Sequence, residues 1–213
     1  MRKMMVVLPL VLVLVMLVGC QKPPQADIDA AKASMDGARA AEATDYAPDS
    51  LKAAEDSQAQ LDAELKVQEQ KFALFRSYKK ATEIAQATKA AGEKAVADAK
   101  AKKEQVKGEA QTLITEAKTA LDEAKALLDK APKGKGTQAD LEAMKADLTG
   151  VETSINEAQN SFNAEKYLDA KSKAEAAKTQ AGNVKTSIEQ AIEAKKAAKA
   201  GKGGKAGMKP AAK

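Results

Sequence analysis

Alanine dominates this chain after its first twenty residues. Residues 21–213 contain 47 alanines but only 25 residues of Leu, Ile, Val and Phe together. Alanine is the best helix former, because ordering it costs no side-chain entropy. So few branched and aromatic side chains cannot fill a conventional globular core. The sequence therefore predicts an all-α protein, an elongated antiparallel bundle of coiled-coil-like, alanine-rich helices that meet along narrow seams.

Residue types that most enzymes depend on are scarce. The chain has no His and a single Cys. Histidine is the commonest general base and the commonest metal ligand, and one cysteine cannot form a metal cluster or an internal disulfide. The acidic residues alternate with lysine, as Glu116, Lys118 and Asp122 do. This spacing is typical of a solvated helix surface with weak pairs four residues apart. We expect no catalytic residue, no metal and no cofactor, and interpret the protein as a non-enzyme.

A short segment at the beginning of the chain has the pattern of a secretion signal. Arg2 and Lys3 precede an uncharged stretch from Met4 to Val18. That stretch is shorter than the roughly 20 apolar residues that a membrane-spanning helix needs, and it ends in small residues, as signal peptides do. Its last four positions resemble the bacterial lipobox: Leu17, Val18, Gly19 and Cys20.

The lipobox resemblance implies a lipid anchor at Cys20. A diacylglycerol would be attached to the thiol, the chain would be cut after Gly19, and the new amino group would carry a further acyl chain such as palmitate. Gln21 stands where enterobacterial lipoproteins retained in the inner membrane have Asp. We therefore expect an outer-membrane lipoprotein facing the periplasm of the cell envelope. In a host of another bacterial group, the choice between the inner and the outer membrane stays open. Three other readings are an ordinary cysteine after a conventional signal, an uncleaved anchor and a core helix.

Prolines and glycines divide the remaining chain. Pro48 suits the first position of a helix, and the run from Pro132 to Gly136 is the clearest internal break. The predicted organisation is a signal peptide over 1–19, a lipidated tether over 20–25, a helical region over 26–131, a Pro/Gly linker over 132–136, a second helical hairpin over 137–194 and a disordered basic tail over 195–213.

Apolar residues recur at heptad spacing in the predicted helices. One helix is expected from Ala26 to Ala43, another from Pro48, and a third from Tyr78 to Lys130. The seam that follows Pro48 consists of Leu51, Ala54, Gln58, Leu61, Leu65, Gln68, Phe72 and Phe75. The two seams after residue 137 consist of Leu141, Met144, Leu148, Val151, Ile155, Ala158 and Phe162, and of Tyr167, Ala170, Ala174, Ala177, Ala181, Val184 and Ile188.

Two stretches of the body share a pattern. Six residues of the first match six of the second, namely Leu51, Phe72, Tyr78, Ala81, Ala85 and Lys89 with Leu141, Phe162, Tyr167, Ala170, Ala174 and Lys178. The match indicates either an internal duplication or the common look of Ala/Lys-rich heptads.

A family resemblance covers the first of these stretches. Residues 46–54, Tyr-Ala-Pro-Asp-Ser-Leu-Lys-Ala-Ala, together with Tyr78-Lys79-Lys80-Ala81, resemble the DUF4398 family of bacterial envelope proteins. The resemblance spans about residues 25–100, and more faintly 138–185, and implies small helical domains that are often carried on lipoproteins. That family has a Gly-Asp-Tyr turn where this chain has Arg76-Ser77-Tyr78. The sequence therefore leaves open whether the second and third helices are continuous.

The end of the sequence is basic. Lys195–Lys213 contains seven lysines and no acid. In an exported protein such a tail favours anionic lipids, or peptidoglycan and other anionic envelope polymers, rather than nucleic acid. A terminal lysine also resembles that of murein-linked lipoproteins, and a plain solubilising tail is the simplest reading.

The functional hypothesis is a membrane-anchored, non-enzymatic helical spacer or binding module. One alternative is a stress-protective Ala/Lys-rich protein of the late-embryogenesis-abundant kind, which residues 90–130 resemble. Another is a structural lipoprotein that contacts peptidoglycan through its tail. The helical seams leave open whether they close within one chain or in a homo-oligomer.

Overall fold

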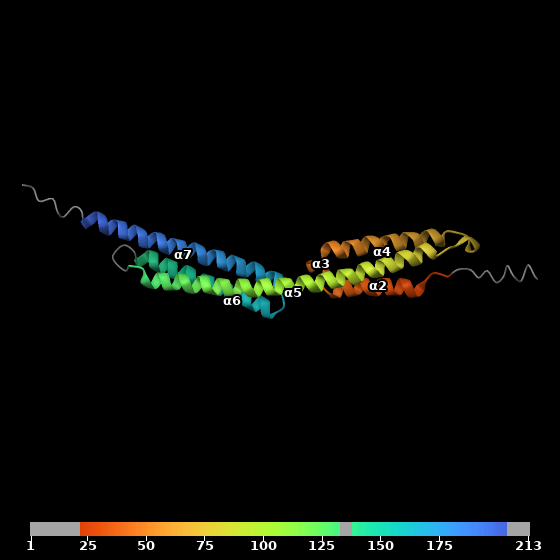
Figure 1. Ribbon diagram of the computed structural model, residues 1–213, viewed down its shortest axis with the longest axis horizontal. Helices are drawn as coiled ribbons and strands as arrows, with labels where there is room; N and C mark the ends of the chain where they lie inside the picture. Colours follow the sequence, from red (N-terminus) through yellow and green to blue (C-terminus); the bar gives the residue numbers. More distant parts are fainter. Residues whose placement is uncertain (1–21, 133–137, 204–213) are drawn as a thin grey trace, which may run out of the picture. The chain divides into compact units, whose positions relative to one another are not determined.

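The computed structural model describes residues 22–132 and 138–203, and every regular element in these ranges is a helix (Figure 1). The all-α prediction is confirmed. The chain divides into two compact units, Met1–Lys102 and Lys103–Lys213. The division falls within one long helix, α5 (Lys79–Lys130), which contributes to both units.

Unit 1 consists of α2 (Gln25–Ala40), the one-turn α3 (Ala43–Tyr46), α4 (Pro48–Glu69) and the first part of α5. Pro48 occupies the start of α4, as predicted. In Figure 1 α2 and α4 lie along this part of α5. Their shared core is small and alanine-rich, and one cluster consists of Ile28, Ala31, Leu61, Tyr78, Ala81 and Ala85.

A glycine lets two helices of unit 1 approach closely. A Cβ atom built on Gly92 in α5 would lie 2.5 Å from Ser34 Oγ, 2.9 Å from Ser34 Cβ and 3.0 Å from the Ser34 carbonyl carbon. Real Cβ contacts are longer than this, so α2 and α5 meet at a distance that only glycine allows. Alanines on both helices serve the same purpose, since Ala31, Ala38, Ala95 and Ala99 are fully buried.

Unit 2 consists of the rest of α5, α6 (Gln138–Asn163) and α7 (Tyr167–Gly203). The chain leaves α6 through Glu165, whose φ of 60° ends the helix in the left-handed region, and Lys166 N–H donates to Ser161 O at 2.9 Å. The two predicted seams are confirmed. Their buried members are Leu148, Val151, Ile155, Ala158, Tyr167, Ala170, Ala174, Ala177, Ala181 and Ile188.

A ladder of ion pairs joins α5 to α7. Three lysines of α7 each contact a glutamate of α5 that lies 62 residues earlier. The Nζ–Oε2 distances are 2.6 Å for Lys171–Glu109, 2.8 Å for Lys178–Glu116 and 2.8 Å for Lys185–Glu123. The pairs recur every seven residues on both helices, so α5 and α7 run parallel in a fixed register. Charges that we expected to pair within one helix therefore connect two helices here.

Several predicted boundaries differ from the structure. The helix expected to reach Ala43 ends at Ala40, because the chain turns there before α3. The helical region expected over 26–131 is divided between the units at residue 102. The tail was expected to be disordered from residue 195, but α7 continues to Gly203, because alanine and lysine sustain a helix. Residues 133–137 and residues 204–213 lie outside the described ranges.

The two matched stretches agree in part. Tyr78 and Tyr167 are buried where α5 and α7 begin, and the alanines three and seven residues after each tyrosine are at most 1% exposed. The phenylalanines differ, since Phe162 packs beside Tyr167 with ring centroids 5.2 Å apart, whereas Phe72 is exposed. Duplication stays a prediction.

Candidate functional site

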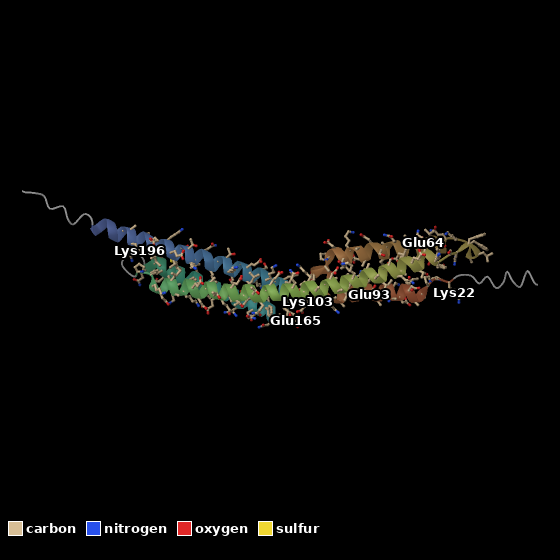
Figure 2. The ribbon with its side chains drawn as sticks, viewed as in Figure 1. Lys22, Glu64, Glu93, Lys103, Glu165 and Lys196 are labelled. Carbon is tan, nitrogen blue, oxygen red and sulfur yellow. The ribbon has the colours of Figure 1, made fainter. Side chains whose placement is uncertain are left out.

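The predicted lipidation motif precedes the described part of unit 1. Leu17, Val18, Gly19 and Cys20 lie outside the described residues. The first described residue, Lys22, is exposed, and α2 begins three residues later at Gln25. Figure 2 shows Lys22 and Glu64 at the same end of unit 1. The chain therefore enters unit 1 at the end where α4 connects to α5.

The α4–α5 connection, residues 70–78, answers the question that the sequence left open. The helix α4 ends at Glu69, a short 3₁₀ turn follows over Ala73–Phe75, and α5 begins at Lys79. The second and third helices are therefore separate. Tyr78, the last residue of this connection, is 4% exposed and belongs to the core cluster of unit 1.

A buried polar network fastens the connection to α4. The Gln68 side chain donates to Glu64 Oε1 at 2.7 Å and accepts from Ser77 N–H at 3.0 Å. Lys80 Nζ contacts Glu64 Oε2 at 2.9 Å. Glu64 and Gln68 are both buried, and the hydrogen bonds from Gln68 and Lys80 hold the pKa of the Glu64 carboxyl below its usual value. The network thus fixes where the chain re-enters the bundle.

Arg76 holds the other side of the connection. Its Nε donates to Lys71 O and its Nη2 donates to Glu69 O, both at 3.0 Å. The last carbonyls of a helix lack partners within the helix, so this guanidinium caps the end of α4. The residues between are held in a defined turn, in which Phe75 N–H donates to Phe72 O at 2.8 Å.

Large apolar side chains project from this turn into solvent. Phe72, Leu74 and Phe75 are 69%, 64% and 76% exposed, and Val67 at the end of α4 is 48% exposed. We call Phe72, Leu74 and Phe75 the apolar tip. The sequence predicted that Phe72 and Phe75 extend the α4 seam, and this is wrong, because the helix ends before them. The apolar spacing gave no signal of this, because Phe72 and Phe75 continue it.

Basic residues flank the apolar tip in the sequence. Residues 66–80 contain five basic side chains and one acidic side chain, Glu69. The basic residues, which we call the basic collar, are Lys66, Lys71, Arg76, Lys79 and Lys80. All four lysines are exposed. Lysines 71, 79 and 80 also line a shallow hollow of about 660 Å³ beside Glu64 and Gln68.

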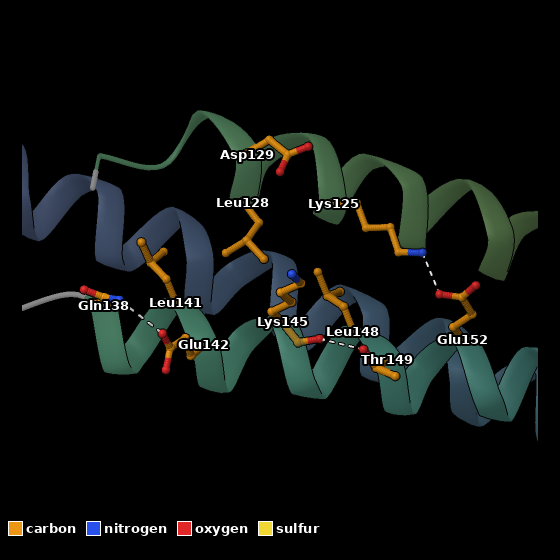
Figure 3. Close-up of a pocket in the computed structure, with 10 residues that line it drawn as sticks. All are labelled: Lys125, Leu128, Asp129, Gln138, Leu141, Glu142, Lys145, Leu148, Thr149 and Glu152. Carbon is orange, nitrogen blue, oxygen red and sulfur yellow. Dashed lines mark hydrogen bonds and ion pairs between the residues drawn. The ribbon is translucent and has the colours of Figure 1, made fainter. Parts of the chain in front are cut away.

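A second hollow lies within unit 2 between α5 and α6 (Figure 3). Its volume is about 780 Å³, and Leu128, Leu141 and Leu148 line it. An ion pair between Lys125 and Glu152, with 2.7 Å between Nζ and Oε2, crosses from α5 to α6 at its edge. The hollow thus combines an apolar lining with a paired charge at its rim, and it holds no arrangement that identifies a ligand.

Other candidate chemistry is sparse in residues 22–132 and 138–203. Within these ranges no group of three or more His, Cys, Asp or Glu is placed to hold a metal ion. None of the helices described is long and apolar enough to span a membrane. Of the predicted basic tail, Lys195 donates to Pro132 O at 3.0 Å and Lys196 pairs with Glu193 at 2.8 Å.

Comparisons of the chain with family models, with curated proteins and with solved structures found no match. The resemblance to the DUF4398 family and the lipobox therefore stay predictions from the sequence.

Proposed function

We propose that this protein is a membrane-anchored envelope lipoprotein whose helices act as a non-enzymatic spacer or binding module. The observation that carries the proposal is the sequence Leu17, Val18, Gly19 and Cys20 at the end of a short apolar segment. Acylation at Cys20 would hold the chain at a bilayer, because each buried lipid methylene contributes about 0.8 kcal/mol and two or three chains suffice.

The short distance between Cys20 and the first helix supports an anchoring role. Only residues 21–24 separate Cys20 from α2. Five residue steps span at most about 17 Å when fully extended. An acylated Cys20 would therefore keep the near end of unit 1 close to the membrane surface. Beyond it, the helices would present long charged surfaces to the periplasm.

The packing of the helices suits a spacer. Alanine seams give each unit a narrow, closely packed interior, and the α5–α7 ion pairs fix the register of unit 2. Side chains on the outside of such helices are available to a partner without any change in the core. As the sequence predicts, the partner would be peptidoglycan or another anionic envelope polymer, which the lysines of Lys195–Lys213 would bind.

Fractionation of cells that express the full chain tests the proposal. Wild-type protein should sediment with membranes and need detergent for release, whereas Cys20→Ala should leave an unprocessed precursor or free protein. A Gln21→Asp variant in an enterobacterial host is a matched control, because it keeps the cysteine and should move the protein to the inner membrane. Wild-type protein that fractionates as free soluble material would refute the proposal.

A further inference from the structure

The apolar tip of unit 1 exposes the most hydrophobic side chains of a chain that has very few. We propose that Phe72, Leu74 and Phe75 insert into the interface of an anionic lipid membrane, where the basic collar contacts the headgroups. This inference rests on the proposed function, since the membrane is the one to which Cys20 would be anchored.

The exposure of the tip is unusual within this molecule. The whole chain has three phenylalanines and three tyrosines. The three tyrosines, Tyr46, Tyr78 and Tyr167, are all buried, while two of the three phenylalanines stand at the tip with more than two thirds of their surface exposed. Clustered apolar exposure on a soluble surface marks an interaction site. Something apolar is therefore expected to cover these rings.

The charge around the tip favours a lipid surface as that cover. The basic collar outnumbers acidic residues five to one within residues 66–80. The charges of Glu64 and Lys80 offset each other in their ion pair, so Lys66, Lys71, Arg76 and Lys79 carry the excess positive charge towards an anionic surface. Lysine and arginine beside exposed aromatic rings are the pattern by which proteins bind the membrane interface, where cations meet anionic headgroups.

The position of the tip agrees with this partner. The first turn of α2 and the end of α4 pack together, because Ile28 and Leu61 share one core cluster with Tyr78 at the start of α5. Figure 1 accordingly shows the start of α2 and the α4–α5 connection at one end of unit 1. A tether of about 17 Å at most from Cys20 would bring that end, and the tip with it, to the bilayer.

The tip is also held in place for insertion. Arg76 bonds two carbonyls on one side of the turn, and Gln68 receives Ser77 N–H on the other. The rings of Phe72 and Phe75 lie beside each other, with centroids 6.4 Å apart. A fixed turn loses little conformational entropy on binding, so the exposed rings can enter an interface without first being ordered.

Tryptophan fluorescence of the full chain tests the inference. The chain has no Trp, so Phe75→Trp introduces a single indole at an exposed position. Leu168→Trp is the matched control, since Leu168 is an exposed apolar residue of unit 2, 43% exposed. Each variant is purified from membranes and reconstituted into phosphatidylglycerol-containing vesicles with brominated acyl chains. The mass of the Cys20 peptide is measured on the same samples.

The proposal predicts a several-fold loss of emission and a shift to shorter wavelength for Phe75→Trp, and neither change for Leu168→Trp. Quenching of Phe75→Trp should weaken when phosphatidylcholine replaces phosphatidylglycerol. Equal quenching in the two lipids would overturn the role given to the basic collar. An unquenched indole at position 75 on a chain with acylated Cys20 would overturn the insertion and leave the proposed anchor intact. Quenching on a chain with unmodified Cys20 would support insertion and refute the anchor.

Two further results would also overturn the inference. Equal quenching of both variants would mean that the chain lies along the bilayer without a preference for the tip. A blue-shifted indole at position 75 in the absence of lipid, with an intensity that depends on protein concentration, would mean that a second copy of the chain covers the tip.

Discussion

The close approach of α2 to α5 at Gly92 predicts opposite effects for two Gly→Ala substitutions in unit 1. Replacing glycine by alanine inside a helix normally stabilises it by about 1 kcal/mol. Gly37 in α2 should follow this rule, because a Cβ atom there would meet only Val96 Cγ2, at an ordinary 3.7 Å. At Gly92 the same gain is opposed by contacts of 2.5, 2.9 and 3.0 Å with Ser34.

The size of the Gly92→Ala effect follows from which atoms collide. Rotation of the Ser34 hydroxyl can relieve the shortest contact, but it would break the hydrogen bond to Ala31 O at 2.7 Å. The other two contacts involve Ser34 Cβ and the backbone carbon, which move only if the helix moves. Overpacking of this kind costs about 1–3 kcal/mol. After subtraction of the helix gain of about 1 kcal/mol, we expect Gly92→Ala to lower the free energy of unfolding by up to about 2 kcal/mol.

Urea unfolding of the full mature chain, followed by helical circular dichroism, measures both variants. With a denaturant slope of about 2 kcal/mol per molar, Gly92→Ala should lower the midpoint by up to about 1 M, while Gly37→Ala should raise it. Hydrogen exchange of α2 peptides assigns the change to unit 1. If Gly92→Ala stabilised the protein as much as Gly37→Ala, α2 and α5 could not approach as described.

Two other perturbations test the ion pairs and the buried carboxyl. Lys178→Glu places a second negative charge beside Glu116 and should lower the free energy of unfolding by about 0.5–1 kcal/mol. Adding Glu116→Lys should restore most of that loss. If urea unfolding showed an equal loss in the double variant, the result would argue against the ion-pair ladder. Hydrogen bonds from Gln68 and Lys80 lower the pKa of Glu64. The ionised carboxyl therefore stabilises the fold above the ordinary carboxyl pKa, and this stabilisation is lost as the pH falls through the lowered pKa. Below about pH 4 the urea midpoint of Glu64→Gln should therefore fall less than that of wild type, and identical acid dependence would contradict the network.

Helical seams could be predicted where the apolar spacing is regular. In α6 and α7 the spacing alone identified the buried positions, because the apolar residues of each seam recur at heptad intervals. In α4 the same rule failed at its end. Phe72 and Phe75 continue the spacing, but the helix stops at Glu69 and a rule of spacing contains no information about where a helix ends.

The relations between helices were beyond the sequence. Glu109, Glu116 and Glu123 recur every seven residues, as do Lys171, Lys178 and Lys185, yet this spacing also fits pairs within a helix. Only the register of α5 against α7 shows which pairs form. The division at residue 102 left no trace in composition, because the α5 helix continues through it.

The candidate site was likewise predicted in part. The sequence indicated Cys20 through its neighbours, and that prediction concerns residues outside the described ranges. The apolar tip was assigned to a seam instead, because exposure depends on the turn that Arg76 and Gln68 hold. No local pattern distinguishes a phenylalanine that extends a seam from one that follows it.

The most direct test of the lipid anchor is the mass of the first peptide of the mature protein, measured on chain purified from bacterial membranes. The account predicts a peptide that begins at Cys20 and carries the mass of a diacylglycerol, with a further acyl chain where the host adds one. A peptide that begins at Met1, or an unmodified Cys20 within a processed chain, would contradict it.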